Sequence, residues 1–203
     1  MKRSYSLVAL ILLTFFVISF LTNIIGPLVP QIIEDFDLSL TLVALLPFAF
    51  FIAYGIMSIP SGMLIEVLGE KKVMMIAFLV AFSGAMLFAL FPSYLIAVGS
   101  LFLIGSGMAM LQVVINPLLR AAGGEENFAF SSVIGQLFFG LASFLSPLVY
   151  SYLVLNIGSE GQGALLQALD SVVPSELPWV SLYWIFAVIS MLMIVVIAMS
   201  KIP

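Results

Sequence analysis

The chain has 203 residues, of which 64% are hydrophobic and 8% charged, and its formal net charge is −4. Soluble domains carry roughly a quarter charged residues, so this composition excludes a soluble globular protein. The absence of Cys and His excludes disulfides, thiolate metal sites and the usual zinc ligand. We therefore expect an integral membrane protein with no cofactor, no metal and no nucleic-acid partner.

Six apolar segments predict an all-α membrane protein that forms one transmembrane domain over residues 1–203. The predicted spans run over about 6–27, 40–65, 73–91, 95–119, 128–154 and 181–200. The start of the first span resembles a signal peptide, but its apolar run is too long and no small-residue cleavage site follows. We expect this segment to remain in the protein as a span.

The connections between the predicted spans are polar. An acidic loop holds Glu34, Asp35 and Asp37, and residues 66–72 form a short charged turn. The longest connection, residues 155–180, is predicted to be external, and within it residues 164–173 are amphipathic enough for a short surface helix. Aromatic residues at the start of the sixth span are typical of an interface belt: Trp179, Tyr183 and Trp184.

The positions of the basic residues predict how the chain is oriented. With six spans, every Lys and Arg falls in the N-terminal tail, the second-to-third turn, the fourth-to-fifth loop or the C-terminal tail. These residues are Lys2, Arg3, Lys71, Lys72, Arg120 and Lys201. Cytoplasmic loops carry the excess of basic residues, so we expect a multi-pass protein of the plasma (inner) membrane with both termini in the cytoplasm.

The fourth predicted span carries the clearest functional signal. Gln112 and Asn116 lie four residues apart, on one face of a helix, and Pro117 follows them. Amides in hydrocarbon need partners, so this face is predicted to line a solute pathway. Two alternatives remain open: both amides can hydrogen bond between packed helices, and Asn116 can satisfy the carbonyl that Pro117 frees.

Two further amides are candidates for the same pathway, Gln136 in the fifth span and Asn23 near the end of the first. Asn23 has the alternative of capping a helix break at the Gly26-Pro27 pair. No Asp, Glu, Lys or Arg lies within a predicted span, so amides and hydroxyls are left to contact a solute. Such a lining suits a neutral, hydroxyl-rich molecule such as a sugar or polyol. Four glycines are expected to allow close helix packing: Gly62, Gly105, Gly107 and Gly140.

The second-to-third turn carries a known pattern. Gly62, Glu66, Gly69, Lys71 and Lys72 resemble the signature of the major facilitator superfamily: a glycine, an acid, a turn glycine and basic residues. In this chain Glu66 stands where an Asp is usual. We expect Gly69 to allow the reversal, and the acid and the bases to pair at the cytoplasmic edge as a latch.

Three other stretches resemble the L-fucose permease branch of that superfamily, and within it the glucose/galactose transporters. They are Pro30-Gln31, the segment from Leu111 to Pro117, and Gln136. The resemblance implies that Gln112 replaces a proton-handling acid. Gly26 aligns with the other such acid and Phe139 with an asparagine, so neither proton coupling nor sugar identity is carried over.

The resemblance implies one six-span half, the N-terminal one, of a twelve-span transporter. We therefore expect a secondary transporter half that moves a neutral sugar, such as a hexose, by alternating access. Its partners would be that solute, the lipid bilayer, and a second six-helix half or another copy of the chain. A truncated chain, one part of a split transporter and a naturally short protein all remain open. The alternative function is a non-transporting assembly or structural subunit, while an enzyme is not expected without His, Cys or an acid inside a span.

Overall fold

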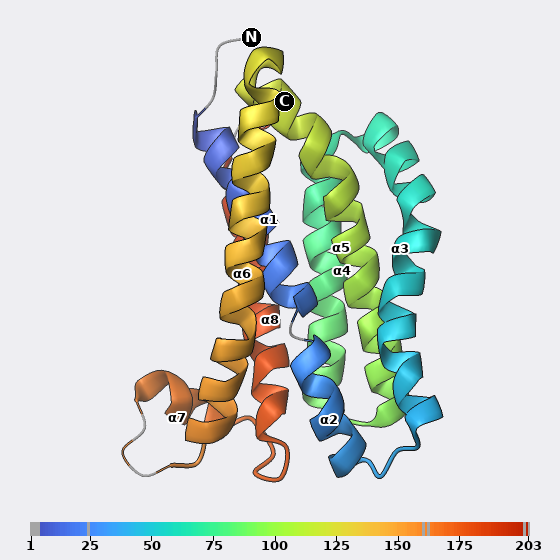
Figure 1. Ribbon diagram of the computed structural model, residues 1–203, viewed down its shortest axis with the longest axis vertical. Coiled ribbons are helices and arrows are strands. Elements are labelled where there is room, and N and C mark those ends of the chain that lie inside the picture. The colour runs from blue at the N-terminus through green and yellow to red at the C-terminus, as the bar shows by residue number, and fades with distance from the viewer. Residues whose placement is uncertain (1–4, 24, 160, 162, 201, 203) are drawn as a thin grey trace.

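The computed structural model describes the whole chain except residues 1–4, 24, 160, 162, 201 and 203. Its described elements are α1 (Tyr5–Asn23), α2 (Ile25–Asp35), α3 (Leu40–Leu68), α4 (Glu70–Leu90), α5 (Tyr94–Gly123), η1 (Glu125–Asn127), α6 (Phe128–Asn156), α7 (Ala164–Asp170), η2 (Pro178–Val180) and α8 (Ser181–Met199) (Figure 1). Within the described residues, six segments are long and apolar enough to span a membrane, with α1 and α2 counted together. The predicted six-span, all-α architecture is confirmed.

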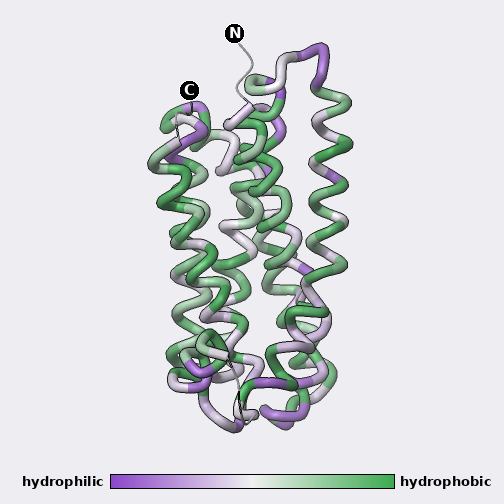
Figure 2. The backbone as a smooth tube through the Cα atoms, turned by 90° about the vertical axis from the view of Figure 1, so that its left-hand side faces the viewer, coloured by the Kyte–Doolittle hydropathy of each residue, from purple (hydrophilic) through white to green (hydrophobic). Residues whose placement is uncertain are grey.

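Helix α5 is the central element of the bundle. It contacts α3, α4 and α1, while α4 also packs on α8 and α1 packs along α6. In Figure 1, α5 runs obliquely from beside α3 to the end of the bundle at which α6 begins. Figure 2 shows hydrophobic residues along the length of the helices and the strongly hydrophilic ones mainly near the two ends, as expected of a bundle that crosses a bilayer.

Two glycines allow α5 to pack this tightly. A Cβ atom on Gly105 would collide with the backbone carbonyl of Phe50 on α3, and one on Gly107 would collide with that of Ala77 on α4. Residues two apart in a helix point to nearly opposite sides. Helix α5 is therefore held between the backbones of α3 and α4, which confirms the predicted role of both glycines.

The same packing is not found within this chain for Gly62 on α3 or Gly140 on α6. A Cβ atom at either position would meet no heavy atom within 4 Å. Both helices are covered on few sides: α6 buries Gly135, Ala142 and Ser146 on the face that meets α1, and Leu153 nearer its end. The two glycines lie on surfaces that no helix of this bundle covers.

The helices extend further than the hydrophobic pattern predicts. Glu34 and Asp35 belong to the last turn of α2, so the predicted acidic loop is shorter than expected. The turn between α3 and α4 contracts to Gly69, whose φ of 79° favours glycine, and Glu66 and Lys71 fall within the flanking helices. Hydropathy marks where apolar residues end, whereas helices continue until the backbone reverses.

The predicted aromatic belt is wrong for two of its three residues. Trp179 and Tyr183 are 0% and 1% exposed. Their rings pack against Phe88, with centroids 5.6 and 4.4 Å from its ring. The Trp179 indole N–H donates to Asp35 Oδ2 at 2.5 Å, which joins the end of α2 to η2, directly before α8. The sequence shows that aromatic residues lie near the end of a span, but it does not show that Phe88 of α4 packs against them.

The basic residues of the second-to-third turn also bond differently from the prediction. Lys71 Nζ donates to the carbonyl oxygens of Ala198 and Ser200, at 2.8 and 2.7 Å, rather than pairing with Glu66. These carbonyls end α8, where a cation stabilises the negative end of the helix dipole. Lys72 makes no hydrogen bond or ion pair to any other described residue. Lys71 is thus the latch, and it joins α4 to α8.

Substitution of Gly107 by Ala should destabilise the chain by about 1–3 kcal/mol, because the new methyl group meets a backbone carbonyl that cannot rotate away. Gly62→Ala is the matched control, and it should leave the melting midpoint of the purified chain unchanged because its Cβ faces open space. Equal melting midpoints for the two variants would contradict the close packing of α5.

Substitution of Lys71 by Gln should lower stability by about 1 kcal/mol through loss of the charge at the α8 C-terminus. Lys72→Gln removes an equal charge from the neighbouring position and should have little effect, while Lys71→Arg should retain most of the stability. Thermal melting of the three variants checks this, and an equal loss for Lys71→Gln and Lys72→Gln would exclude the latch.

Candidate functional site

The amides of α5 lie where this helix emerges from its neighbours. Residues 104–111 are all buried, whereas Gln112 is partly exposed and Asn116 is exposed. Arg120 continues this face by one more turn. The face is covered along the middle of α5 and uncovered from Gln112 to the end of the helix, which places both amides on an open surface of the bundle.

The third candidate, Gln136, occupies a corresponding place on α6. Its neighbour Gly135 faces α1, where a Cβ would lie 3.0 Å from the Phe15 ring. Gln136 is exposed, and Gly140, one turn further along, shares its face. Leu137 and Leu141, which are 68% and 50% exposed, lie about 100–140° around the helix from Gln136. Gln136 and Gly140 thus form a small and polar face of α6, and Leu137 and Leu141 form a large apolar face beside it.

The fourth candidate, Asn23, is bonded within the bundle. Its Nδ2 atom donates to the Ser19 carbonyl oxygen and to Ser19 Oγ, at 2.9 and 3.0 Å. Ser19 Oγ donates in turn to the Phe139 carbonyl of α6 at 2.6 Å. Asn23 therefore belongs to a network that ties α1 to α6, and these bonds run back along α1 rather than across a helix break.

The other three amides have no such bonds. Among the described residues, no hydrogen bond is made by the side chains of Gln112, Asn116 or Gln136. Bonding between helices of this chain, or to the carbonyl freed by Pro117, is therefore not what occupies them. An unpaired amide in hydrocarbon costs several kcal/mol, so these groups require water, a solute or another protein surface.

The four candidates come from three helices and lie at two depths. With a rise of 1.5 Å per residue, Gln112, Asn116 and Gln136 lie roughly 10–16 Å from the helix ends beside the termini. Asn23 lies roughly 27 Å along α1 from Tyr5. Beside Asn23, the Tyr54 hydroxyl of α3 interacts with the Thr22 side chain of α1.

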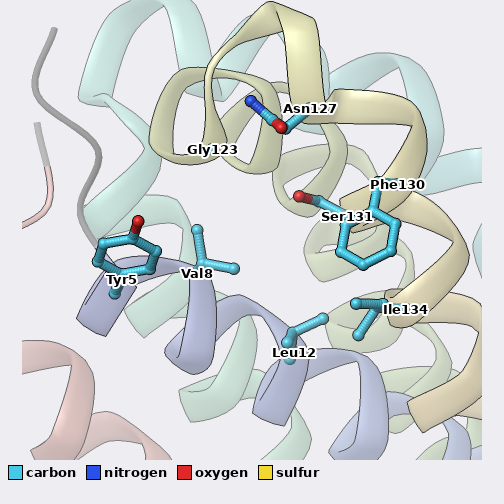
Figure 3. A pocket seen from close by; sticks show the side chains of 8 residues that line it. All are labelled: Tyr5, Val8, Leu12, Gly123, Asn127, Phe130, Ser131 and Ile134. Carbon is cyan, nitrogen blue, oxygen red and sulfur yellow. The ribbon is translucent and has the colours of Figure 1, made fainter.

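A hollow of about 240 Å³ lies between the start of α1, the end of α5 and the start of α6, and Figure 3 shows the side chains that line it. It is lined by Tyr5, Val8, Leu12, Gly123, Asn127, Phe130, Ser131 and Ile134. None of the four predicted amides lines it. A second, open hollow does include one of them, and it is lined by Asn116, Pro117, Arg120, Ala121 and Phe128.

Charged side chains lie at the ends of the described helices rather than along their middle. The acids and bases of the described helices lie in end turns, such as Glu66 on α3 and Arg120 on α5. Within the described part of the chain, no group of three or more Asp and Glu residues is placed to hold a metal ion. The open face therefore offers amide and hydroxyl groups, which can exchange hydrogen bonds with hydroxyls of a solute.

Comparisons with known proteins give matches to a protein family and to individual transporters. The model of the Major Facilitator Superfamily matches residues 11–202. A glucose/galactose transporter of Brucella abortus is 32% identical over 159 residues, which are 77% of this chain and 38% of that protein. The L-fucose-proton symporter of Escherichia coli is 28% identical over 181 residues, 87% of this chain and 40% of the symporter.

A solved structure gives the same result for the fold. The crystal structure of the transporter FucP in its outward conformation superposes with a TM-score of 0.75 at 25% identity, over 97% of this chain and 50% of FucP. The chain spans about half the length, or less, of the relatives that it matches.

The two faces of α6 should differ in their access to water. Two single-cysteine variants test this, Gln136→Cys on the polar face and Leu141→Cys on the apolar face, because the chain itself has no Cys. In membranes, Gln136→Cys should react with a water-soluble maleimide at least several times faster than Leu141→Cys. Equal rates, with both variants folded, would show that the Gln136 face does not meet water.

Proposed function

This chain belongs to the major facilitator superfamily, and from that premise we propose that it forms the N-terminal half of a secondary transporter for a neutral sugar such as a hexose. Transport would proceed by alternating access, with the solute bound between this half and a second six-helix half. The substrate class is supported by the relatives, which are a glucose/galactose transporter and an L-fucose-proton symporter.

The observation that carries the proposal is that three of the predicted amides have no hydrogen-bond partner among the described residues, namely Gln112, Asn116 and Gln136. Gln112 on α5 is partly exposed, and Asn116 on α5 and Gln136 on α6 are exposed. A sugar hydroxyl both donates and accepts, as an amide does. Asn23, whose Nδ2 atom is bonded to Ser19, would contact the solute with its side-chain amide oxygen, further along the bundle from the termini than the other three amides.

The uncovered small residues support the presence of a second half. Gly55 and Gly62 on α3, and Gly140 on α6, face open space. Glycines at such positions let another helix approach closely, and in a bilayer this packing is a main source of helix association. We infer that α3 and α6 meet the second half with these faces. The same role is consistent with another copy of this chain.

Orientation and coupling follow from the charges. The basic residues that the structure describes, Lys71, Lys72 and Arg120, lie at the end of the bundle where α4 begins and α5 and α8 end, so we infer that this end is cytoplasmic. Gly26 and Gln112, which align with the family's proton-handling acids, carry no ionisable group. Proton or sodium coupling would therefore rest on groups outside these positions, and uncoupled facilitated transport is the alternative.

Sugar binding should stabilise the purified chain, either alone or with a co-expressed second half. A ligand at a hundred times its Kd stabilises by about 2.7 kcal/mol. D-glucose, D-galactose and L-fucose are compared by thermal melting in wild type, in Gln112→Ala, and in Ser83→Ala as a polar control on α4. We expect at least one sugar to raise the midpoint in wild type and Ser83→Ala, and the rise to be much smaller in Gln112→Ala.

Folded protein that no neutral sugar stabilises in either state would count against the proposed site. The non-transporting subunit makes a different prediction. In that case Gln112→Ala would reduce co-purification of the second half and leave any sugar-dependent shift unchanged.

A further inference from the structure

The hollow at the end of α5 contains a group that the neutral pathway does not explain. Arg120 lines it together with Asn116, Pro117, Ala121 and Phe128. Arg120 lies on the same face of α5 as Gln112 and Asn116. The three polar side chains follow one another along this face at intervals of one helical turn. A solute that leaves Gln112 toward this end of the bundle passes Asn116 and then Arg120.

The guanidinium of Arg120 contacts an aromatic ring but is not fully paired. Its Cζ atom lies 4.7 Å from the centroid of the Phe128 ring, which is a cation–π contact. Its Nη1 atom is 3.8 Å from Glu125 Oε1, and the side chains of Arg120 and Glu125 are 58% and 85% exposed. Such an exposed pair contributes little and exchanges readily with water, so guanidinium donors remain available to a ligand.

Together, the lining groups suit a polyhydroxyl ligand. Arg120 supplies only donors, in a rigid fork that can bind two adjacent hydroxyl oxygens, and the Asn116 amide supplies both donors and an acceptor. The Asn116 amide has no partner among the described residues. The hollow has a volume of about 410 Å³ and is open to solvent, so a ligand can enter without rearrangement of the backbone.

We propose that the hollow of Asn116, Arg120 and Phe128 is a second subsite for the transported sugar, at the mouth of the pathway beside the termini. Arg120 and Asn116 bind two adjacent hydroxyl groups of the solute there. The solute occupies this subsite either before it reaches Gln112 or after it leaves Gln112. This subsite rests on the proposed function, because it is a station on the same pathway. Its exposure implies weak binding and fast exchange, as release requires.

The test uses two single-cysteine reporters in the naturally Cys-free chain, placed in membrane vesicles. Ala121→Cys reports on the hollow and Val113→Cys reports on the region of Gln112. The reaction rate of each with N-ethylmaleimide is measured with and without a saturating D-glucose, D-galactose or L-fucose. We expect one of these sugars to slow both reactions at least threefold, and Arg120→Gln to remove the effect at Ala121→Cys but not at Val113→Cys. Lys72→Gln, which removes an equal charge elsewhere, should change neither.

The outcomes separate the subsite from the transporter. Sugar protection of Val113→Cys alone, or equal protection of Ala121→Cys with and without Arg120, would overturn the subsite and leave the proposed function standing. No protection at either reporter, in folded protein, would overturn both. A second measurement avoids cysteine variants, which could misfold. The wild-type chain and Arg120→Gln are titrated with the same sugar, and the apparent affinity of the variant should be several-fold weaker. Equal affinities would exclude Arg120 as a contact.

Discussion

The close contact of α5 with two neighbouring backbones is the constraint on which the rest of the bundle depends. Gly105 and Gly107 place α5 directly against the carbonyls of Phe50 and Ala77. In a bilayer, helices gain little by hiding apolar side chains from lipid, so close van der Waals contact and bonds between helices supply the association. Ser100 adds such a bond, since its hydroxyl donates to the Gly84 carbonyl of α4 at 2.6 Å. Helices α3, α4 and α5 thus form a unit with little freedom to shift.

This packing determines where the amides can act. Helix α5 is buried on all sides over residues 104–111. Beyond them one face becomes exposed, at Gln112 and Asn116, while Val114, Ile115 and Leu118 keep the other side of the helix buried. The oblique course of α5 carries its last turns away from α3 and toward α6 (Figure 1). Gln112 and Gln136 thus lie at a similar depth on two different helices.

The sequence predicted most of the fold and only part of the site. Span number and approximate position follow from hydropathy, since a bilayer requires long apolar helices. The close packing predicted for Gly105 and Gly107 is confirmed, whereas Gly62 and Gly140 meet no atom of this chain within 4 Å, so their packing role stays a prediction. The sequence does not distinguish a glycine that packs inside its own chain from one that faces another surface. Trp179 and Lys71 were misassigned for a related reason. Their partners, Asp35 and the end of α8, are more than a hundred residues away, and no local pattern records such a contact.

The contrast between hydroxyl and amide side chains explains why the candidate site could be found at all. A serine or threonine in a helix can satisfy its own hydroxyl by donating to a carbonyl one turn earlier, as Thr14 does to Leu10 at 2.9 Å and Ser106 to Phe102 at 2.8 Å. Such residues carry little information about function. A glutamine has a longer side chain with a donor and an acceptor, and the helix backbone rarely satisfies both. Gln112 and Gln136 are therefore tolerated only where something outside the chain supplies partners, and their free amides indicate an incomplete surface more strongly than any of the hydroxyls around them.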